Sequence, residues 1–270
     1  KAKKIILVGD QNQLPAYADA EVSPTLAKLT KNPDYRLFDI LYNSLPDTHK
    51  QILTTQYRMI ENIGNLISKV FYRGIIVTGC NDDEKRHGLN RYVGKSIVWF
   101  DTSANKKKSQ KRTKGGSYIN EEEKRIILEI LDDLKSTGEL KGLDIGIITG
   151  YSGQKELLRK SIKATGLDKI ASKIDINTLD AFQGRENDII IYSTVRTRDS
   201  IGFQKEKERV NVAFSRAKKL LIVCGDKNFF YNFDDQDNKF VEIIDYISEE
   251  EECEIIQCDG GKLFERESNS

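Results

Sequence analysis

The sequence is poor in the residues that build metal centres. It has four cysteines, none of them in a C-x-x-C pair, and two histidines among 270 residues. Structural zinc sites need about four such ligands at short spacings, so we expect no metal ligand in this chain. We interpret the cysteines as reduced thiols of a cytoplasmic protein, with Cys224 inside an apolar strand.

Long apolar runs and an excess of either charge are missing as well. No run reaches the roughly 20 residues of a membrane helix, so no membrane partner is expected, and no signal peptide opens the chain. Lysine and arginine number 43 against 42 acidic residues, so the net charge of +1 identifies no partner and any nucleic-acid contact must be local. The length and the 38% hydrophobic fraction fit a globular protein of one large domain, or one and a half smaller ones.

The residues that are present point to residues 177–216 as the centre of the chain. Gly184 marks a place where the backbone must come close to something. Residues 209–218 predict a short helix with an apolar stripe and with Arg209 and Arg216 seven positions apart. That spacing is about two helical turns, so both guanidinium groups should point the same way. Such a pair suits a polyphosphate better than a single carboxylate.

This part of the chain resembles motifs V and VI of the superfamily 1 helicases. The branch concerned contains the RNA helicase of nonsense-mediated decay and its senataxin-like relatives. The patterns D-x-F-Q-G-x-E-x-D and R-x-N-V-A-x-[ST]-R-A-[KR] are matched by residues 180–188 and 209–218. The resemblance implies that Gly184, Glu186 and Arg209 meet the nucleotide, Glu186 at its ribose. It also implies that Thr178 touches the nucleic-acid backbone.

Two earlier segments resemble further motifs that face the nucleotide. Residues 3–10 predict a buried strand, and the segment that follows resembles motif III, G-D-x-x-Q-L-x-P. There Asp10 lies at the strand end, where ligands bind in open α/β sheets, and Gln13 senses the terminal phosphate. Gln56-Tyr57-Arg58-Met59 resembles motif IV, with Ile60-Glu61 in place of His-Pro. The resemblance implies that Arg58 reaches the phosphates, although the residue alone also fits a surface arginine at a helix start.

A third segment resembles the family pattern T-P-Y-x-x-Q. Thr149, Tyr151 and Gln154 are kept, and Gly150 replaces the proline. The resemblance places nucleic acid at this strand end, so Thr149 and Tyr151 join Thr178 as nucleic-acid candidates. Tyr151 by itself also fits a side chain that packs under the loop.

A basic run lies outside these motifs, at residues 105–114. It holds six cations and no aromatic residue: Lys106, Lys107, Lys108, Lys111, Arg112 and Lys114. One interpretation is a solvated, mobile loop. The other is a basic lip on a nucleic-acid channel, which would grip phosphates and not stack on bases.

Strands and helices alternate over residues 51–247, which predicts an α/β fold with a mainly parallel sheet and helices on both faces. The resemblance narrows this to the second RecA-like domain of a P-loop NTPase, at residues 47–248. Residues 1–46 would be the carboxyl-terminal remnant of the first RecA-like domain. Residues 249–270 begin with four glutamates and are expected to form a frayed acidic tail.

The family's phosphate-binding G-x-x-x-x-G-K-[ST] loop and acidic magnesium-holding pair do not occur in these 270 residues. The chain therefore reads as part of a helicase whose first RecA-like domain would be its partner and would hold most of the ATP and Mg²⁺. Arg58 and Arg216 would stabilise charge on the transferring phosphoryl group. Gln13, the third catalytic candidate, and Gln183 would relay the nucleotide state to a groove for single-stranded DNA or RNA.

Two alternatives to an unwinding enzyme stay open. One is an ATP-driven translocase or remodeller that does not unwind. The other is a non-catalytic RecA-like binding module. The motifs do not distinguish DNA from RNA, because that choice depends on contacts with the 2′-hydroxyl. The polarity of movement, 5′ to 3′, follows only by analogy with the family.

Overall fold

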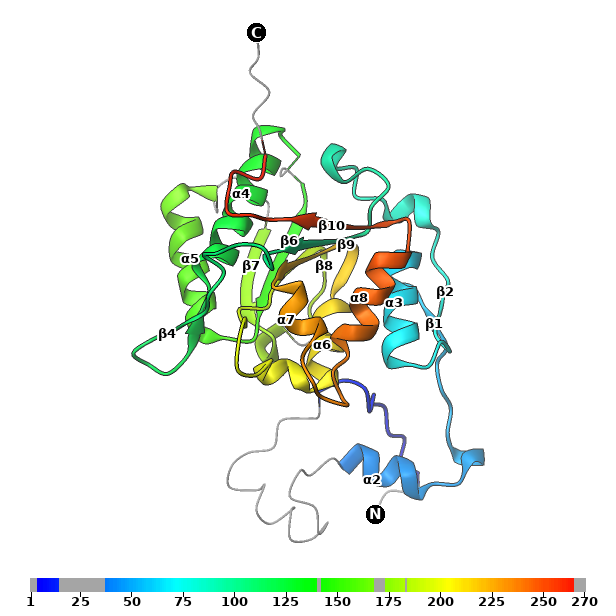
Figure 1. Ribbon diagram of the computed structural model, residues 1–270. Coiled ribbons are helices and arrows are strands. Elements are labelled where there is room, and N and C mark those ends of the chain that lie inside the picture. Colours follow the sequence, from blue (N-terminus) through cyan, green and yellow to red (C-terminus); the bar gives the residue numbers. More distant parts are fainter. Residues whose placement is uncertain (1–3, 15–36, 140–141, 168–172, 183, 265–270) are drawn as a thin grey trace.

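The computed structural model describes residues 4–14, 37–139, 142–167, 173–182 and 184–264. A sheet of six parallel strands forms its centre, in the order β10-β3-β9-β8-β6-β7 (Figure 1). The strands are β3 (Ile97–Asp101), β6 (Asp144–Thr149), β7 (Lys173–Thr178), β8 (Asn187–Ser193), β9 (Ala217–Gly225) and β10 (Cys253–Gln257). The predicted α/β fold with a parallel sheet is confirmed.

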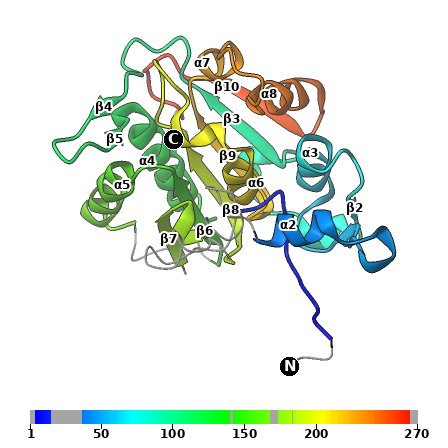
Figure 2. The same cartoon turned by 90° about the horizontal axis from the view of Figure 1, so that it is seen from below.

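Helices cover both faces of this sheet (Figure 2). One face carries α4 (Glu121–Ser136) and α5 (Ser152–Thr165). The other carries α3 (Glu61–Phe71), α6 (Lys207–Phe214), α7 (Lys227–Tyr231) and α8 (Phe240–Glu249). Residues 97–100 of β3 are all apolar because both faces of the sheet are covered. Ile97 and Trp99 enter one core, and Val98 and Phe100 enter the other.

Several short elements lie outside the central sheet. Strands β1 (Thr55–Gln56) and β2 (Val77–Thr78) form a parallel pair, and β4 (Lys111–Arg112) and β5 (Tyr118–Ile119) form an antiparallel one. Helix α2 (Leu37–Ser44) precedes them. The 3₁₀ turns are η1 (Asp47–His49), η2 (Asp82–Lys85), η3 (Asn90–Tyr92), η5 (Asp180–Phe182) and η6 (Gly202–Lys205). None of the helices in the described ranges has the length and apolar character needed to span a bilayer.

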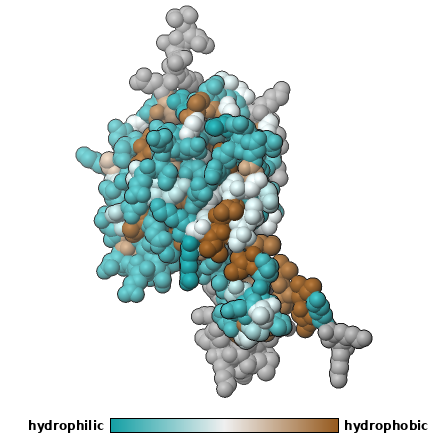
Figure 3. All heavy atoms as spheres, turned by 90° about the vertical axis from the view of Figure 1, so that its right-hand side faces the viewer, coloured by the Kyte–Doolittle hydropathy of each residue, from teal (hydrophilic) through white to brown (hydrophobic). Residues whose placement is uncertain are grey.

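The strand predicted at residues 3–10 is wrong for the part that the structure describes. Residues 4–10 have no regular structure, and Val8 is 92% exposed. Apolar side chains gather along this segment and on the neighbouring side of the molecule (Figure 3). An apolar run becomes a buried strand only where another strand pairs with it, and none does among the described residues.

The acidic tail expected at residues 249–270 also needs correction. Residues 253–257 form β10, which pairs with β3 at the edge of the sheet. Ile255 packs against the core on one face and Ile256 against the core on the other. The four glutamates therefore precede a strand whose apolar residues complete both cores.

Candidate functional site

Five of the predicted nucleotide-site residues meet at one place: Asp10, Gln13, Arg58, Glu186 and Arg216. We call them the arginine cluster. Arg58 Nε donates to Glu186 Oε2 at 2.7 Å. Arg216 Nη2 donates to Gln13 Oε1 at 3.1 Å, and Gln13 Nε2 donates to Asp10 Oδ2 at 2.9 Å. Segments almost the whole length of the chain apart thus supply one polar site.

The turn that carries Arg58 is shaped by Gln56 from the same motif. Gln56 Oε1 accepts the backbone N–H groups of Arg58 at 2.9 Å and Met59 at 2.8 Å. The next residue, Ile60, is buried, and its N–H donates to the carbonyl of Lys218 at 2.8 Å. Because the backbone on both sides of Arg58 is fixed, its half-exposed side chain projects toward the cluster.

Arg216 is the least neutralised charge of the cluster. Its residue is 3% exposed, and its Nε and Nη1 donate to the carbonyls of Val212 at 3.0 Å and Arg185 at 3.4 Å. In the described part of the chain no carboxylate lies within ion-pair distance of it. Burial and, next, the charge of Arg58 lower the pKa of Arg216 to about 10. The carboxylates of Glu186 and Asp10 act on Arg216 from beyond ion-pair distance and offset this lowering only in part. Burying a guanidinium without a direct ion pair is costly, so an anionic ligand would be stabilised at this position.

Arg209 and Arg216 do not share a helix, which corrects the sequence prediction. Helix α6 ends at Phe214, because the chain turns at Ser215 to enter β9 at Ala217. Arg209 donates to Glu206 Oε2 at 2.9 Å and to Asp180 Oδ1 at 2.8 Å. Burial acts to lower the pKa of Arg209, but these hydrogen bonds outweigh it and the pKa is raised. Arg209 is thus neutralised within the fold.

Gly184 lies in the turn between η5 and β8. Its φ is +81°, and no atom lies within 4 Å of the Cβ that another residue would carry. Glycine is required there by the left-handed backbone, since nothing crowds the position in this chain. Gln183, next to it, lies outside the described residues.

The three nucleic-acid candidates lie together at the carboxyl ends of two neighbouring strands. Thr149 of β6 and Thr178 of β7 are paired in register, and the N–H of Leu179 donates to the carbonyl of Thr149 at 3.1 Å. Thr149 is fully buried and Tyr151 is 4% exposed, whereas Thr178 is half-buried. The packing interpretation of Tyr151 therefore agrees with its position.

Residues 34–228 match the family model described as an AAA domain. An uncharacterized ATP-dependent helicase of Methanocaldococcus jannaschii is 32% identical over 95% of this chain and 37% of its own length. Helicase SEN1 of Saccharomyces cerevisiae is 34% identical over 83% of this chain and 10% of its own. A regulator of nonsense transcripts 1 homolog of Neurospora crassa is 30% identical over 83% of this chain and 20% of its own. The chain belongs to the senataxin-like superfamily 1 helicases. It spans just over a third of the first relative and less of the others.

Two residues of this helicase chain complete the arginine cluster and were not predicted. Tyr72 Oη donates to Asp10 Oδ2 at 2.6 Å. Asn211 Nδ2 donates to Tyr72 Oη at 3.0 Å and to the carbonyl of Asn12 at 2.7 Å. Burial, then the hydrogen bond with Asp10, raises the pKa of Tyr72 to about 12, so the phenol stays protonated. The asparagine of motif VI was a signal for Asn211, whereas Tyr72 follows an apolar helix and gave none.

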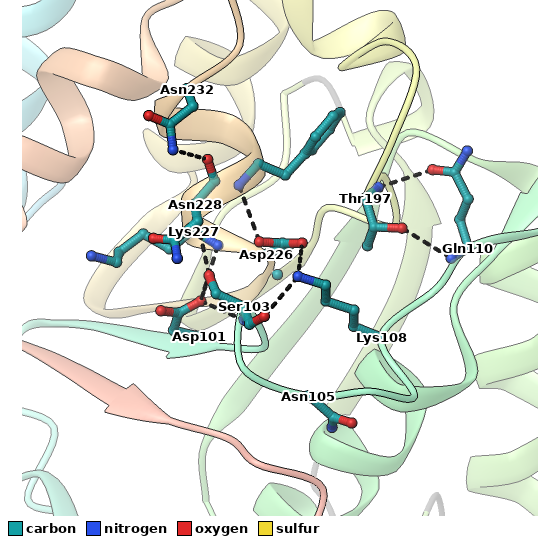
Figure 4. Close-up of polar contacts among 12 residues, drawn as sticks. Asp101, Ser103, Asn105, Lys108, Gln110, Thr197, Asp226, Lys227, Asn228 and Asn232 are labelled. Atoms are coloured by element: carbon teal, nitrogen blue, oxygen red, sulfur yellow. Dashed lines mark hydrogen bonds and ion pairs between the residues drawn. The ribbon is translucent and has the colours of Figure 1, made fainter.

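The basic run of this helicase is anchored at its middle (Figure 4). Lys108 Nζ lies 2.7 Å from Asp226 Oδ2, just after β9. The N–H of Gln110 donates to Thr197 Oγ1 at 3.1 Å, and the N–H of Thr197 donates to Gln110 Oε1 at 2.9 Å. The run also contains β4, which pairs with β5, so part of it has regular structure. Its other cations are exposed: Lys106, Lys107, Lys111, Arg112 and Lys114.

The residues of the cluster fit a polyphosphate but not the metal that accompanies it. Within the described ranges no group of three or more His, Cys, Asp or Glu side chains could hold a metal ion. Asp10 is already engaged by Gln13, by Tyr72 and by the N–H of Asn12 at 2.9 Å. No magnesium ligand is therefore assigned to this part of the helicase.

Proposed function

We propose that this chain is part of an ATP-dependent helicase that moves along single-stranded DNA or RNA. The observation that carries the proposal is Arg216, a buried guanidinium beside Arg58 with neutral acceptors only among the described residues. A phosphate chain would supply the direct ion pair that Arg216 lacks, with the bidentate geometry that arginine favours. Residues 47–257, which include β10, then act as the second RecA-like domain and residues 1–46 as the end of the first.

Each residue of the cluster has a definite task in this proposal. Arg58 and Arg216 stabilise negative charge on the transferring phosphoryl group. Glu186 orients Arg58 through the 2.7 Å ion pair and faces the sugar, and Gln13 joins Arg216 to Asp10. Mg²⁺ bound with ATP would supply further neutralisation of the phosphates and would be held by the first RecA-like domain. The left-handed turn at Gly184 lets the chain pass from Asp180 to Glu186.

The nucleic-acid contact is proposed at the carboxyl ends of β6 and β7. Thr149 and Tyr151 are buried under the carboxyl ends of these strands and support them. Thr178 is half-buried, and we assign its hydroxyl group to the nucleic-acid contact. The names of the relatives quoted above agree with a helicase, and cytoplasmic location stays part of the proposal. Arg209, expected at the nucleotide, is engaged by Asp180 and Glu206, so we assign it to holding α6 beside the site.

The test uses the full-length protein, with ATP hydrolysis and strand displacement measured on the same preparation. Arg58→Ala should lower nucleic-acid-stimulated hydrolysis by at least about 100-fold, because one of the two charge-stabilising groups is lost. Arg86→Ala is the control, since Arg86 is an exposed arginine paired with Asp83 outside the cluster. Hydrolysis without displacement would favour the translocase, and no hydrolysis in the wild type would favour the binding module.

A further inference from the structure

Three aromatic rings and two arginines form a row at the carboxyl edge of the sheet. The rings of Tyr118 and Tyr151 are 5.6 Å apart, and those of Tyr151 and Phe203 are also 5.6 Å apart. The guanidinium of Arg196 lies 4.2 Å from the Tyr118 ring and that of Arg209 lies 5.3 Å from the Phe203 ring. We call these five residues the strand-end aromatic group. Its members come from β5, the turn after β6, the loop after β8, η6 and α6.

The row is buried at its middle and open at one end. Tyr151 is 4% exposed, whereas Phe203 is 50% exposed and lies on top of it. Gly202 makes this packing possible, because its φ is +64° and a Cβ there would stand 2.1 Å from Tyr151 Oη. A Cβ on Gly150, next to the nucleic-acid candidates, would lie 3.9 Å from Phe203. The tyrosine that was predicted to face nucleic acid is thus covered by a phenylalanine that faces solvent.

Buried hydrogen bonds connect the backbone beneath this group to α4. Glu123 of α4 is fully buried and accepts the N–H of Val195 at 2.9 Å and the hydroxyl of Ser193 at 2.6 Å. Val195 has a φ of +69°, a conformation that a β-branched residue adopts only when its surroundings impose it. Arg196 follows directly and is held over Tyr118. The loop after β8 is therefore fixed at the point where it joins the row.

Exposed positive charge borders the aromatic group. Tyr118 is paired in register with Arg112 of β4, and Lys111 and Arg112 are exposed. Neither forms an ion pair with any other residue that the structure describes. Proteins commonly bind single-stranded nucleic acid with an exposed aromatic ring next to cations that form no ion pair. The cations contact phosphates and the ring stacks on a base.

We propose that Phe203 stacks against a nucleobase of the bound strand, while Lys111 and Arg112 contact its phosphates. The ligand class rests on the proposed function, but the assignment of Phe203 rests on its packing and exposure. The contact would be tolerant of sequence, since every base presents a face on which a ring can stack. The aromatic residue that the basic run lacks in sequence is thus supplied from a distant part of the chain.

Binding of the full chain to a fluorescent oligo(dT) or oligo(U) 15-mer tests this assignment by anisotropy. Phe203→Ala and Phe203→Leu should each weaken binding on the order of 5- to 100-fold, because both remove the ring. Phe203→Trp should stay within about threefold of the wild type, since it keeps a ring face. Tyr231→Ala is the matched control, because Tyr231 is a 41% exposed aromatic on α7 outside the group.

Salt and base removal separate stacking from charge. The slope of the logarithm of the binding constant against the logarithm of salt concentration should be unchanged in Phe203→Ala but shallower by about one in Arg112→Ala. Only the arginine neutralises a phosphate and thereby releases a counterion from the nucleic acid. Wild type and Phe203→Ala should bind an abasic strand equally. Equal binding of the intact strand by both proteins would overturn the stacking assignment alone. Failure of the wild type to bind any strand would overturn the proposed nucleic-acid function with it. Circular dichroism melts check that each variant is folded.

Discussion

Arg216 and Arg209 lie seven residues apart and occupy opposite electrostatic settings. Arg216 is buried among carbonyl and amide oxygens beside a second arginine, and its pKa is lowered to about 10. Arg209 is bonded to Glu206 and Asp180, and its pKa is raised despite burial. The hydrogen-bond acceptors of Arg216 are all neutral, whereas Arg209 is paired directly with two carboxylates.

The difference separates a ligand site from its support. A charge that the fold neutralises contributes to local structure, whereas a buried charge left with neutral partners costs stability until a ligand binds. Such strain in a site is commonly retained for function. In the arginine cluster, Glu186 is paired with Arg58 and leaves Arg216 without a direct ion pair. In the strand-end aromatic group, Arg209 is paired with both Asp180 and Glu206.

The largest effect is expected from the loss of Arg216, which tests the contrast with Arg209 directly. In the full-length protein, Arg216→Ala should reduce the turnover of ATP by about 1,000-fold or more, the scale of an arginine that stabilises phosphoryl transfer. Arg216→Lys should not restore it, because an ammonium lacks the planar fork. Arg209→Ala is the matched comparison and should cost far less in turnover. Equal losses in steady-state assays would remove the distinction between the two arginines.

Glu123 provides the next largest effect, on stability and not on chemistry. Glu123→Ala leaves Val195 N–H and the hydroxyl of Ser193 without their buried acceptor, so the free energy of unfolding should fall by about 3 kcal/mol. Glu121→Ala, in the same first turn of α4 but with a 41% exposed side chain, should change it by less than about 0.5 kcal/mol. Urea unfolding measures both, and similar values would show that the network is not a support.

The same carboxyl group predicts a pH dependence. Burial raises the pKa of Glu123 from its usual 4.5 to about 8, against the hydrogen bonds from Ser193, Val195 and Thr194. The folded protein keeps this proton over a range in which the unfolded chain loses it. Its contribution to stability is therefore complete below about pH 4.5 and declines as the pH rises toward 8. Relative to Glu123→Ala, the wild type should lose stability between pH 5 and 8, and a constant difference would contradict the raised pKa.

Tyr72 tests how tightly the N-terminal segment is joined to the cluster. Tyr72→Phe removes the hydroxyl that donates to Asp10 and accepts from Asn211. Each of the two lost hydrogen bonds is worth about 1 kcal/mol, and only the one to Asp10 bears on the cluster directly, so ATP turnover of the full-length protein should fall roughly 3- to 10-fold. Tyr231→Phe, on α7, should leave turnover unchanged. Unchanged turnover in Tyr72→Phe would show that Gln13 and the N–H of Asn12 are enough to hold Asp10.

The smallest effect is expected from substituting Gly184. A matched substitution at Gly150, next to the strand-end aromatic group, gives the comparison. Gly184→Ala forces a Cβ into a left-handed position and should lower the free energy of unfolding by about 1 kcal/mol. At Gly150 a Cβ would make ordinary contact with Phe203 at 3.9 Å, so Gly150→Ala should be close to neutral. Thermal melts compare the two. A neutral Gly184→Ala would indicate that the glycine serves a ligand and not the turn.

Local pattern was enough for much of this protein. The alternation of apolar segments predicted the parallel sheet, because strands buried on both faces must be apolar throughout. Local chemistry also fixes the start of α4, where Asn120, a residue type favoured at the N-cap, accepts the N–H groups of Glu122 and Glu123 through Oδ1. Arg58, Glu186 and Arg216 were found through long motifs whose residues the fold brings together.

Only the tertiary structure decided how these pieces are used. Residues 4–10 contain the longer apolar run, yet they are mostly exposed, whereas residues 253–257, with a glutamate and a glutamine among them, pair with β3. Helical spacing put Arg209 and Arg216 on one face, but β9 begins at Ala217 and ends the helix before Arg216. The sequence by itself determined the types of residue and the family. Whether a charge is neutralised, or a ring is covered, depended on contacts between distant segments, which a local pattern does not contain.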